Sequence, residues 1–286
     1  MESGLYLPIY MIYLGHSLRG YQKRERMLTL KAAKAIAQQH GFGSLITEPH
    51  ANAKLLKSVG WYNAGISLAQ ASLSGVNMCS ASTAQCREAC LGGTGRSEFT
   101  PSIVKSRIGR TKLYSSDIRS FWSVLLPELH KVDRKAKRLG IPVAFRPNIL
   151  SDQAWHIKLP EMFEEFPHWQ FYGYTKVKSY VSAAIQGKLP KNYHLTYSWS
   201  ERARLDYVAT LLDNGINVAV PFYDRNSLRP KIPMRWNGWN VIDGDVSDLR
   251  FNDPTGVIVG LSVKLPKNRI KAVNRIVKSE GFFVGV

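Results

Sequence analysis

The segment YHLTYSWSERARLDYVATLLDNGINVAVPF, residues 193–222, contains the pattern that predicts the fold. It begins and ends with short runs rich in aromatic and β-branched residues, YHLTYS and INVAVPF, and the intervening SERARLDYVATLLDNG is long enough for one loop and one helix. A strand, a helix and a second strand in this order form a right-handed crossover that leaves the two strands parallel. The segment therefore predicts one βαβ unit of a parallel sheet.

Similar runs recur at regular intervals on both sides of this unit. They are PVAFRPN at 142–148, HWQFYGYT at 168–175 and WNVIDGD at 239–245. These three runs, the two runs of the βαβ unit and a short strand at Ile66, Leu68 and Ala69 make six strands. We expect GVIVGLSVK at 256–264 to add a further strand at the edge of the sheet. We therefore expect an α/β fold in which right-handed crossovers coil the sheet into an open or closed barrel.

The part of the chain before this regular pattern predicts helices. Periodic apolar positions predict helices over 28–39, 101–114 and 117–138, the last of which ends at Gly140. We interpret residues 1–51 as an N-terminal arm and helix and residues 52–286 as a single barrel-like domain. The first 26 residues either form a peripheral arm or lie upstream of a start at Met27.

The charge balance of the chain is strongly basic. There are 39 lysines and arginines against 21 aspartates and glutamates, which gives a formal net charge of +18. Such an excess favours a polyanionic partner, and we expect nucleic acid or a nucleotide on the basic surface; a solvated surface without a specific partner is the alternative. No apolar run has the length of a membrane span or the pattern of a secretion signal, so we expect a cytoplasmic protein.

Polar residues follow each strand from PVAFRPN onward, at the carboxyl ends where βα folds bind their ligands. These residues are Arg146, Asn148, Ser151, Asp152, Tyr174, Thr175, Lys176, Ser198, Ser200, Glu201, Tyr223, Asp224, Arg225, Asp243, Gly244, Asp245 and Asp248. Lys176 is the one we favour as functional. Ser200 is also placed to be a helix N-cap, and the three aspartates Asp243, Asp245 and Asp248 are an alternative site for a divalent cation.

All three cysteines of the chain lie in one short stretch, MCSASTAQCREAC at 78–90. An odd number of local cysteines cannot form a disulfide framework, which indicates a reducing compartment. Thiolates bind soft or borderline metals, so we predict that Cys79, Cys86 and Cys90 are metal ligands. An iron–sulfur cluster on three cysteines keeps one iron open, whereas a structural zinc needs a fourth ligand, for which His50 is the best candidate. Free thiols without metal are the third alternative.

These cysteines fall between the first predicted strand and the first helix of the βα series, and this position resembles the radical S-adenosylmethionine superfamily. In that family three cysteines of this loop bind a [4Fe-4S] cluster, the open iron binds S-adenosylmethionine, and the fold is a partial (βα)6 barrel. The resemblance therefore implies both cofactors for this chain, together with an electron donor as partner. It also implies a partial (βα)6 barrel with N-terminal helical decoration.

The same resemblance implies roles for individual residues. Cofactor-binding residues would come from the glycine-rich turn after the cysteines and from successive strand ends: Gly92, Gly93, Arg96, Asn148, Ser151, Tyr174 and Ser198. Lys176 and Asp152 would be the catalytic residues. One electron from the cluster would cleave S-adenosylmethionine into a radical that abstracts hydrogen from the substrate, while the protein orients the reactants and excludes water.

A second resemblance covers most of the chain from about Asn52 onward. It is carried by NAKLLKS (52–58), CSASTAQCREACLGGTGR (79–96), VKSRIGRTKLY (104–114), RPNILSD (146–152), FYGYTK (171–176), YHLTYSWSE (193–201) and VIDGDVSDLRF (241–251). This succession is similar to the phage-associated family Gene product 88, which implies a phage or phage-like origin and a bacterial cytoplasm as the workplace.

Three functional hypotheses follow. The first is a phage-encoded radical S-adenosylmethionine-like enzyme with a [4Fe-4S] cluster. The second is a basic phage factor that binds nucleic acid or a host protein and in which the metal site is structural. The third, which we favour least, is a Mg²⁺-dependent phosphodiesterase built on Asp243, Asp245 and Asp248.

Overall fold

The computed structural model describes residues 27–49, 58–90, 100–224, 231–263 and 281–285. Its strands are β1 (Ile46–Thr47), β2 (Tyr62–Ile66), β3 (Val143–Arg146), β4 (Gln170–Thr175), β5 (Tyr193–Ser198), β6 (Val218–Tyr223), β7 (Arg235–Trp236), β8 (Trp239–Asp243), β9 (Ile258–Ser262) and β10 (Val284–Gly285). Its helices are α1 (Leu30–Gln39), α3 (Ala84–Glu88), α5 (Pro101–Ser116), α6 (Ile118–Leu139), α7 (Trp155–Lys158), α8 (Glu161–Glu165), α9 (Lys178–Ile185), α10 (Leu205–Asp213) and the 3-10 helix η3 (Arg250–Asn252).

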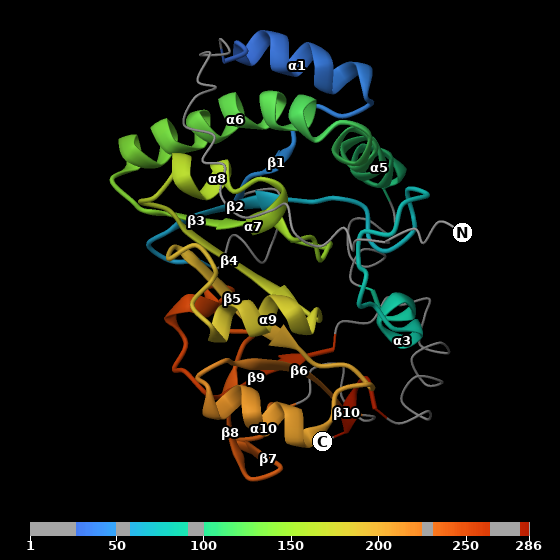
Figure 1. The fold of residues 1–286 in the computed structure, drawn as a ribbon, viewed down its shortest axis with the longest axis vertical. Helices are drawn as coiled ribbons and strands as arrows, with labels where there is room; N and C mark the ends of the chain where they lie inside the picture. The colour runs from blue at the N-terminus through green and yellow to red at the C-terminus, as the bar shows by residue number, and fades with distance from the viewer. Residues whose placement is uncertain (1–26, 50–57, 91–99, 225–230, 264–280, 286) are drawn as a thin grey trace, which may run out of the picture.

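All ten strands belong to one sheet, in the order β1-β2-β3-β4-β5-β6-β9-β8-β7, with β10 beside β6. The sheet runs from β1, near α1 and α6, to β7 at the opposite end of the molecule (Figure 1). This confirms the predicted α/β class. Within the described ranges the two edge strands, β1 and β7, do not pair with each other, so the sheet is open.

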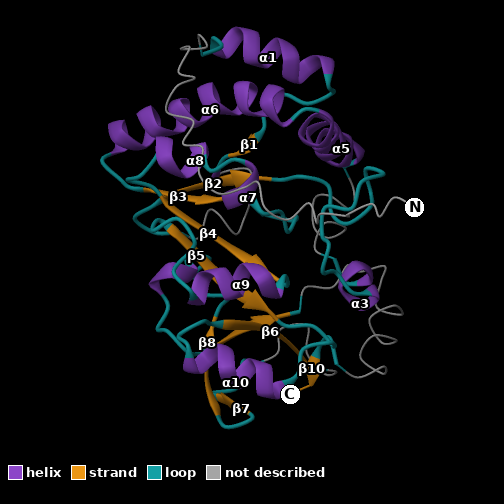
Figure 2. Ribbon diagram, viewed as in Figure 1, coloured by secondary structure: helices purple, strands orange, loops and turns teal. Residues whose placement is uncertain are grey.

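Strands β2 to β6 are parallel, and each pairs with the next along the chain. Alternate residues of these strands, such as Phe145, Phe171 and Leu195, point to one face of the sheet. They belong to the large apolar core that also includes side chains of α5 and α6. Figure 2 shows the helices α9 and α10 in front of the neighbouring strands, and α9 contacts β4 and β5 while α10 contacts β6. The predicted βαβ units are therefore present in this part of the sheet.

We expected the strand at 256–264 to lie at the edge of the sheet, and this prediction was wrong. It forms β9, between β6 and β8, and is parallel to both. Ile258 and Val259 are fully buried, and a Cβ atom on Gly260 would lie 2.4 Å from Ile232 Cγ2. A continuous apolar run favours a central strand, buried on both faces, and this displaces the less buried β8 outward.

The first predicted strand lies slightly earlier in the chain than expected. We predicted it at Ile66, Leu68 and Ala69, whereas β2 ends at Ile66. All five residues of β2 are buried, and a Cβ on Gly65 would approach the Arg146 carbonyl oxygen to 2.3 Å. Leu68 and Ala69 are also buried, but they lie in the loop after β2. The Ala69 N–H donates to the Thr111 hydroxyl of α5 at 2.8 Å.

The three predicted helices in the first half of the chain are confirmed as α1, α5 and α6. The Asp117 side chain caps the start of α6, and the helix ends at Gly140 in the left-handed conformation, with φ of 66°. No described helix is both long and apolar enough for a transmembrane span. The domain boundary after residue 51 stays a prediction, and β1, on its N-terminal side, pairs antiparallel with β2.

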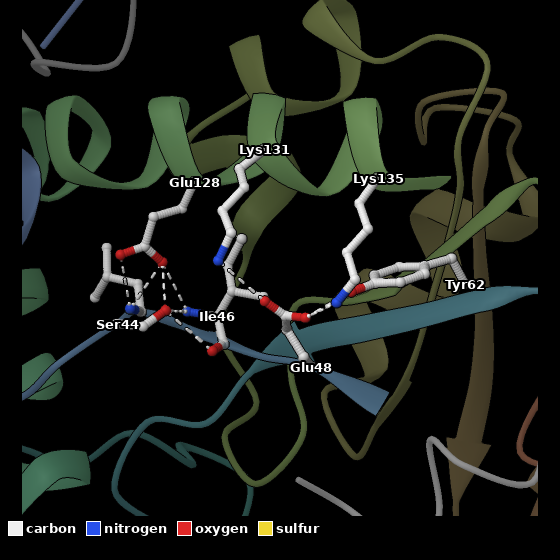
Figure 3. Close-up of polar contacts among 8 residues, drawn as sticks. Ser44, Ile46, Glu48, Tyr62, Glu128, Lys131 and Lys135 are labelled. Carbon is white, nitrogen blue, oxygen red and sulfur yellow. Dashed lines mark hydrogen bonds and ion pairs between the residues drawn. The ribbon is translucent and has the colours of Figure 1, made fainter. Parts of the chain in front are cut away.

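The buried carboxylate of Glu128 on α6 attaches the segment before β1 to the core (Figure 3). It accepts hydrogen bonds from the backbone N–H groups of Leu45 at 3.0 Å and Ile46 at 3.1 Å, and from the Ser44 hydroxyl at 2.7 Å. Burial raises the pKa of the Glu128 carboxyl, and these hydrogen bonds lower it in part. Replacing the carboxylate would leave buried N–H groups without a partner.

A second carboxylate, Glu48, connects β1 to α6 nearer the surface (Figure 3). It pairs with Lys135 at 2.6 Å and Lys131 at 3.3 Å and accepts the Tyr62 hydroxyl at 2.7 Å. Partial burial by itself would raise the pKa of Glu48, but the hydrogen bonds from Lys135, Tyr62 and Lys131 outweigh it and lower the pKa to about 2.

We predict that Glu128→Ala lowers the free energy of unfolding by about 3 kcal/mol, because it removes the acceptor of two buried backbone donors. The matched control Glu164→Ala changes an exposed glutamate and should stay within about 0.5 kcal/mol of the wild type. Urea denaturation followed by circular dichroism measures both variants. Equal stability of the two variants would contradict this role of Glu128.

We predict that Glu48 stabilises the fold in a pH-dependent way. Its pKa is lowered from 4.5 to about 2 on folding, so its contribution is complete above pH 4.5 and is lost as the pH falls towards 2. Because Lys131 and Lys135 are well exposed, we expect only about 1 kcal/mol. Denaturation of wild type and Glu48→Gln should show this difference at neutral pH and convergence near pH 2; a difference that persists in acid would refute the assignment.

Candidate functional site at the carboxyl ends of the strands

The cysteine loop is docked on the loop that follows β3. Cys79 and Asp152 form a parallel β-bridge, and the Asp152 N–H donates to the Met78 carbonyl at 2.9 Å. The Cys79 thiol lies 3.5 Å from the Leu150 carbonyl oxygen and accepts the Ala71 N–H at 3.5 Å. Bridged residues on parallel strands have their side chains on the same side, so the Cys79 thiol and the Asp152 carboxyl group share one face of this loop pair.

Thr83 connects the same loop to the carboxyl end of β5. Its buried side chain caps α3 by accepting the Cys86 N–H at 3.0 Å and donates to Glu201 at 2.8 Å. This contact holds the helix that carries Cys86 against the loop after β5. We did not predict a role for Thr83, although its position three residues before Cys86 is the usual N-cap spacing.

The three thiols are half-buried and close enough to influence one another. Burial raises the pKa of Cys79 to about 11; the Ala71 hydrogen bond opposes this shift, and the charges of Asp152, Cys90 and Cys86 add to it. In the described ranges, no group of at least three His, Cys, Asp or Glu side chains lies close enough together to hold a metal ion. The cysteines therefore share one electrostatic environment without forming a ligand set as they stand.

Asp152 is the most unusual group of this site. One oxygen, Oδ2, accepts the Lys176 N–H at 2.8 Å, while Oδ1 is shielded from solvent and has no hydrogen-bond partner among the described residues. Burial raises the pKa of the Asp152 carboxyl, and hydrogen bonds from Lys176 and Thr175 lower it in part. A buried acceptor without a partner is costly, so a hydrogen bond donated to Oδ1 would stabilise the site.

Lys176 and Ser198 complete the cluster from the ends of β4 and β5. The Lys176 ammonium group donates to the Ser198 hydroxyl and lies 5.6 Å from the centre of the Phe282 ring. The structure thus brings Lys176, Asp152, Ser198 and Cys79, which the sequence predicted as site residues, to one edge of the sheet. A cationic donor, a hydroxyl, a carboxyl and a thiol are together there.

Asn148 and Ser151 have structural contacts inside the loop that presents Asp152. The Asn148 side-chain oxygen accepts Ser151 Oγ at 2.7 Å, the Gln153 N–H at 3.1 Å and Trp155 Nε1 at 2.8 Å. Its amide donates to the Gln153 carbonyl at 2.9 Å. Since these polar groups are buried and paired, the two residues shape the loop; their contact with a cofactor stays a prediction.

Arg146 and Tyr174 belong to a buried network on the sheet face opposite the main core. The Arg146 guanidinium pairs with Asp248 at 2.9 Å and lies 4.7 Å from the centre of the Tyr174 ring. The Tyr172 hydroxyl donates to Asp248 at 2.9 Å and also bonds to Asn63. We predicted Arg146, Tyr174 and Asp248 as separate strand-end residues, and the roles of Tyr172 and Asn63 were missed. A cofactor contact of Tyr174 stays a prediction.

The aspartates at the end of β8 have different partners. Asp243 accepts the Asp245 N–H at 2.9 Å, Asp245 accepts the Ser262 N–H at 2.8 Å, and Asp248 pairs with Arg146. Within the described part of the chain they do not form a cation site. The N-cap interpretation of Ser200 was wrong, because α10 begins at Leu205 with Arg204 as its N-cap residue.

Five residues named from the sequence lie outside the described residues. They are His50, Gly92, Gly93, Arg96 and Arg225. Their predicted roles, as zinc ligand, cofactor-binding residues and strand-end residue, stay predictions.

We predict that Cys79 in the metal-free protein is alkylated with a pH midpoint near 11 rather than near 9, because burial disfavours its thiolate. In Asp152→Asn the midpoint should move down, because a neighbouring negative charge is removed. Iodoacetamide labelling at increasing pH, with peptide mass spectrometry, follows Cys79 separately from Cys86 and Cys90. A wild-type midpoint near pH 9, or an unchanged midpoint in Asp152→Asn, would contradict the burial of Cys79 beside Asp152.

Comparison with known proteins identifies the family. The family model described as Gene product 88 matches residues 43–276, which include both the cysteine loop and all strand ends of the candidate site. No curated protein and no solved structure matches the chain. The comparisons do not support the resemblance to the radical S-adenosylmethionine superfamily. The resemblance to Gene product 88 predicted from the sequence is confirmed, and the chain belongs to that family.

Proposed function

We propose that the protein is a phage-encoded iron–sulfur protein, with Cys79, Cys86 and Cys90 as ligands of a [4Fe-4S] cluster, and that it acts as a radical S-adenosylmethionine-like enzyme. The observation that carries the proposal is the docking of Cys79 on the Asp152 loop, beside Lys176 and Ser198. It combines soft metal ligands with a cation, a hydroxyl and a carboxyl group at the ligand-binding edge of a parallel sheet.

The donor set fits such a cluster in kind. The donors are thiols only, and they lie on one short loop at the carboxyl end of β2. Cys86 lies on α3, while Cys90 lies two residues beyond the end of this helix, where its N–H donates to the Arg87 carbonyl at 3.4 Å. The three sulfurs would have to move closer together to hold a cluster, because no ligand set of described residues is formed as they stand.

When bound, a cluster with an open iron supplies the electron that cleaves S-adenosylmethionine. The residues around it would bind and orient the reactants. Lys176 and Ser198 offer hydrogen-bond donors to an anionic group, and the free Oδ1 of Asp152 offers an acceptor to a donor group. The consecutive parallel strands β2 to β6 support a partial barrel of this enzyme type, and the family supports a bacterial cytoplasm as the workplace.

The test is metal binding in protein purified without oxygen. The wild type should contain iron and sulfide in comparable amounts, while Cys79→Ala, Cys86→Ala and Cys90→Ala should each lose most of both, because three thiolates hold the cluster. The controls Ser80→Ala and Ser82→Ala change the same loop and should keep the metal. Elemental analysis and visible absorption measure the result.

Turnover distinguishes the enzyme from the alternative. Reduced, reconstituted protein should form 5′-deoxyadenosine from S-adenosylmethionine, and Lys176→Gln should form less of it while it retains the iron. Iron retained without any 5′-deoxyadenosine would favour a binding factor with a structural metal site. Zinc in place of iron, or full metal content in the cysteine variants, would refute the cluster.

A further inference from the structure

The carboxyl-terminal half of α6 carries an excess of positive charge at the end of the molecule far from β7 (Figure 1). Lys131, Arg134, Lys135 and Arg138 follow one another at helical spacing, so they form one stripe along the helix. Lys131, Arg134 and Arg138 are exposed, while Val132 and Ala136, on the other side of the helix, are buried in the core. The stripe is about 10 Å long at 1.5 Å per residue.

The neighbouring helix α1 adds to this charge. It packs on α6 through the buried Ala33 and Ala37, and its Lys31 and Lys34 are exposed. We call the set of Lys31, Lys34, Lys131, Arg134, Lys135 and Arg138 the cationic face.

Few carboxylates neutralise the cationic face. Glu48 pairs with Lys131 and Lys135 at the same time, and its side chain is only 19% exposed. Asp133 is engaged by Lys137 at 2.8 Å and by His168 at 2.7 Å. Among the described residues, Arg134, Arg138, Lys31 and Lys34 have no acidic partner. The helix dipole favours cations only in the last turn of α6, so it does not account for Arg134 or for the two lysines of α1.

We propose that the cationic face binds the phosphate backbone of double-stranded DNA. A row of long, exposed cations on a rigid helix matches a row of phosphates, whose neutralisation releases counterions. The apolar side of α6 is already buried in the protein core, so this helix has no apolar surface to insert into a lipid bilayer. This inference concerns a different surface from the cysteine site and does not depend on a metal.

Binding should be independent of DNA sequence, because the cationic face contacts backbone phosphates rather than bases. The affinity should also fall steeply as salt is added.

The test compares two double variants of the full chain. Arg134→Gln/Arg138→Gln removes two exposed charges of the cationic face, and Lys188→Gln/Lys191→Gln removes two exposed charges between α9 and β5. Both variants carry the same net charge, and circular dichroism melting verifies that both are folded. Fluorescence anisotropy with a short labelled DNA duplex of mixed sequence gives the affinity over a range of salt concentrations.

We expect the first variant to bind about tenfold more weakly, with the slope of log affinity against log salt reduced by about two, and the control to change less than about twofold. Equal weakening of both variants would mean that only the net charge matters and would overturn the proposal. So would absence of duplex binding by the wild type at low salt. Tighter binding to phosphatidylserine vesicles than to the duplex, lost in the first variant, would assign the face to a membrane instead.

Discussion

Parallel pairing of β2 with β3, β3 with β4, and β4 with β5 is the constraint on which the candidate site depends. Because these strands run in the same direction and each pairs with the next along the chain, their carboxyl ends meet at one edge of the sheet. Asp152, Lys176 and Ser198 are separated in sequence by helices, yet they become neighbours there. The cysteine loop follows β2 and is added to the same edge through the bridge between Cys79 and Asp152.

The buried ion pair between Arg146 and Asp248 fills part of the sheet face opposite the main core. It ties the segment before η3 to the strands, and Tyr172, Leu249 and Ala144 pack beside it as a small apolar cluster. The Phe251 ring lies 5.6 Å from Tyr172, between ring centres, and covers this face further. A buried ion pair of this kind stabilises little by itself, but removing one partner leaves an uncompensated charge. The middle of this face is therefore filled by side chains of the protein, whereas Asp152, Lys176 and Ser198 lie at the strand ends.

The sequence predicted the elements better than their order. Alternating strands and helices identified the α/β class, and strand-end positions identified Asp152, Lys176 and Ser198 as neighbours of the cysteine loop. The central position of β9 was missed because an apolar run does not reveal which strands flank it. The network of Asn63, Tyr172 and Asp248 was missed because long-range partners leave no local pattern. Thr83 carried a local N-cap signal, but its contact with Glu201 depends on the tertiary fold.

We propose that Cys79, Cys86 and Cys90 would hold one iron centre close to Asp152, Lys176 and Ser198. Iron X-ray absorption of the anaerobically purified chain, recorded before and after addition of S-adenosylmethionine, tests this arrangement. We expect a sulfur shell with iron–iron scattering, and an added shell of nitrogen or oxygen neighbours once S-adenosylmethionine is present. Mononuclear iron without iron–iron scattering, or a cluster spectrum that S-adenosylmethionine leaves unchanged, would contradict it.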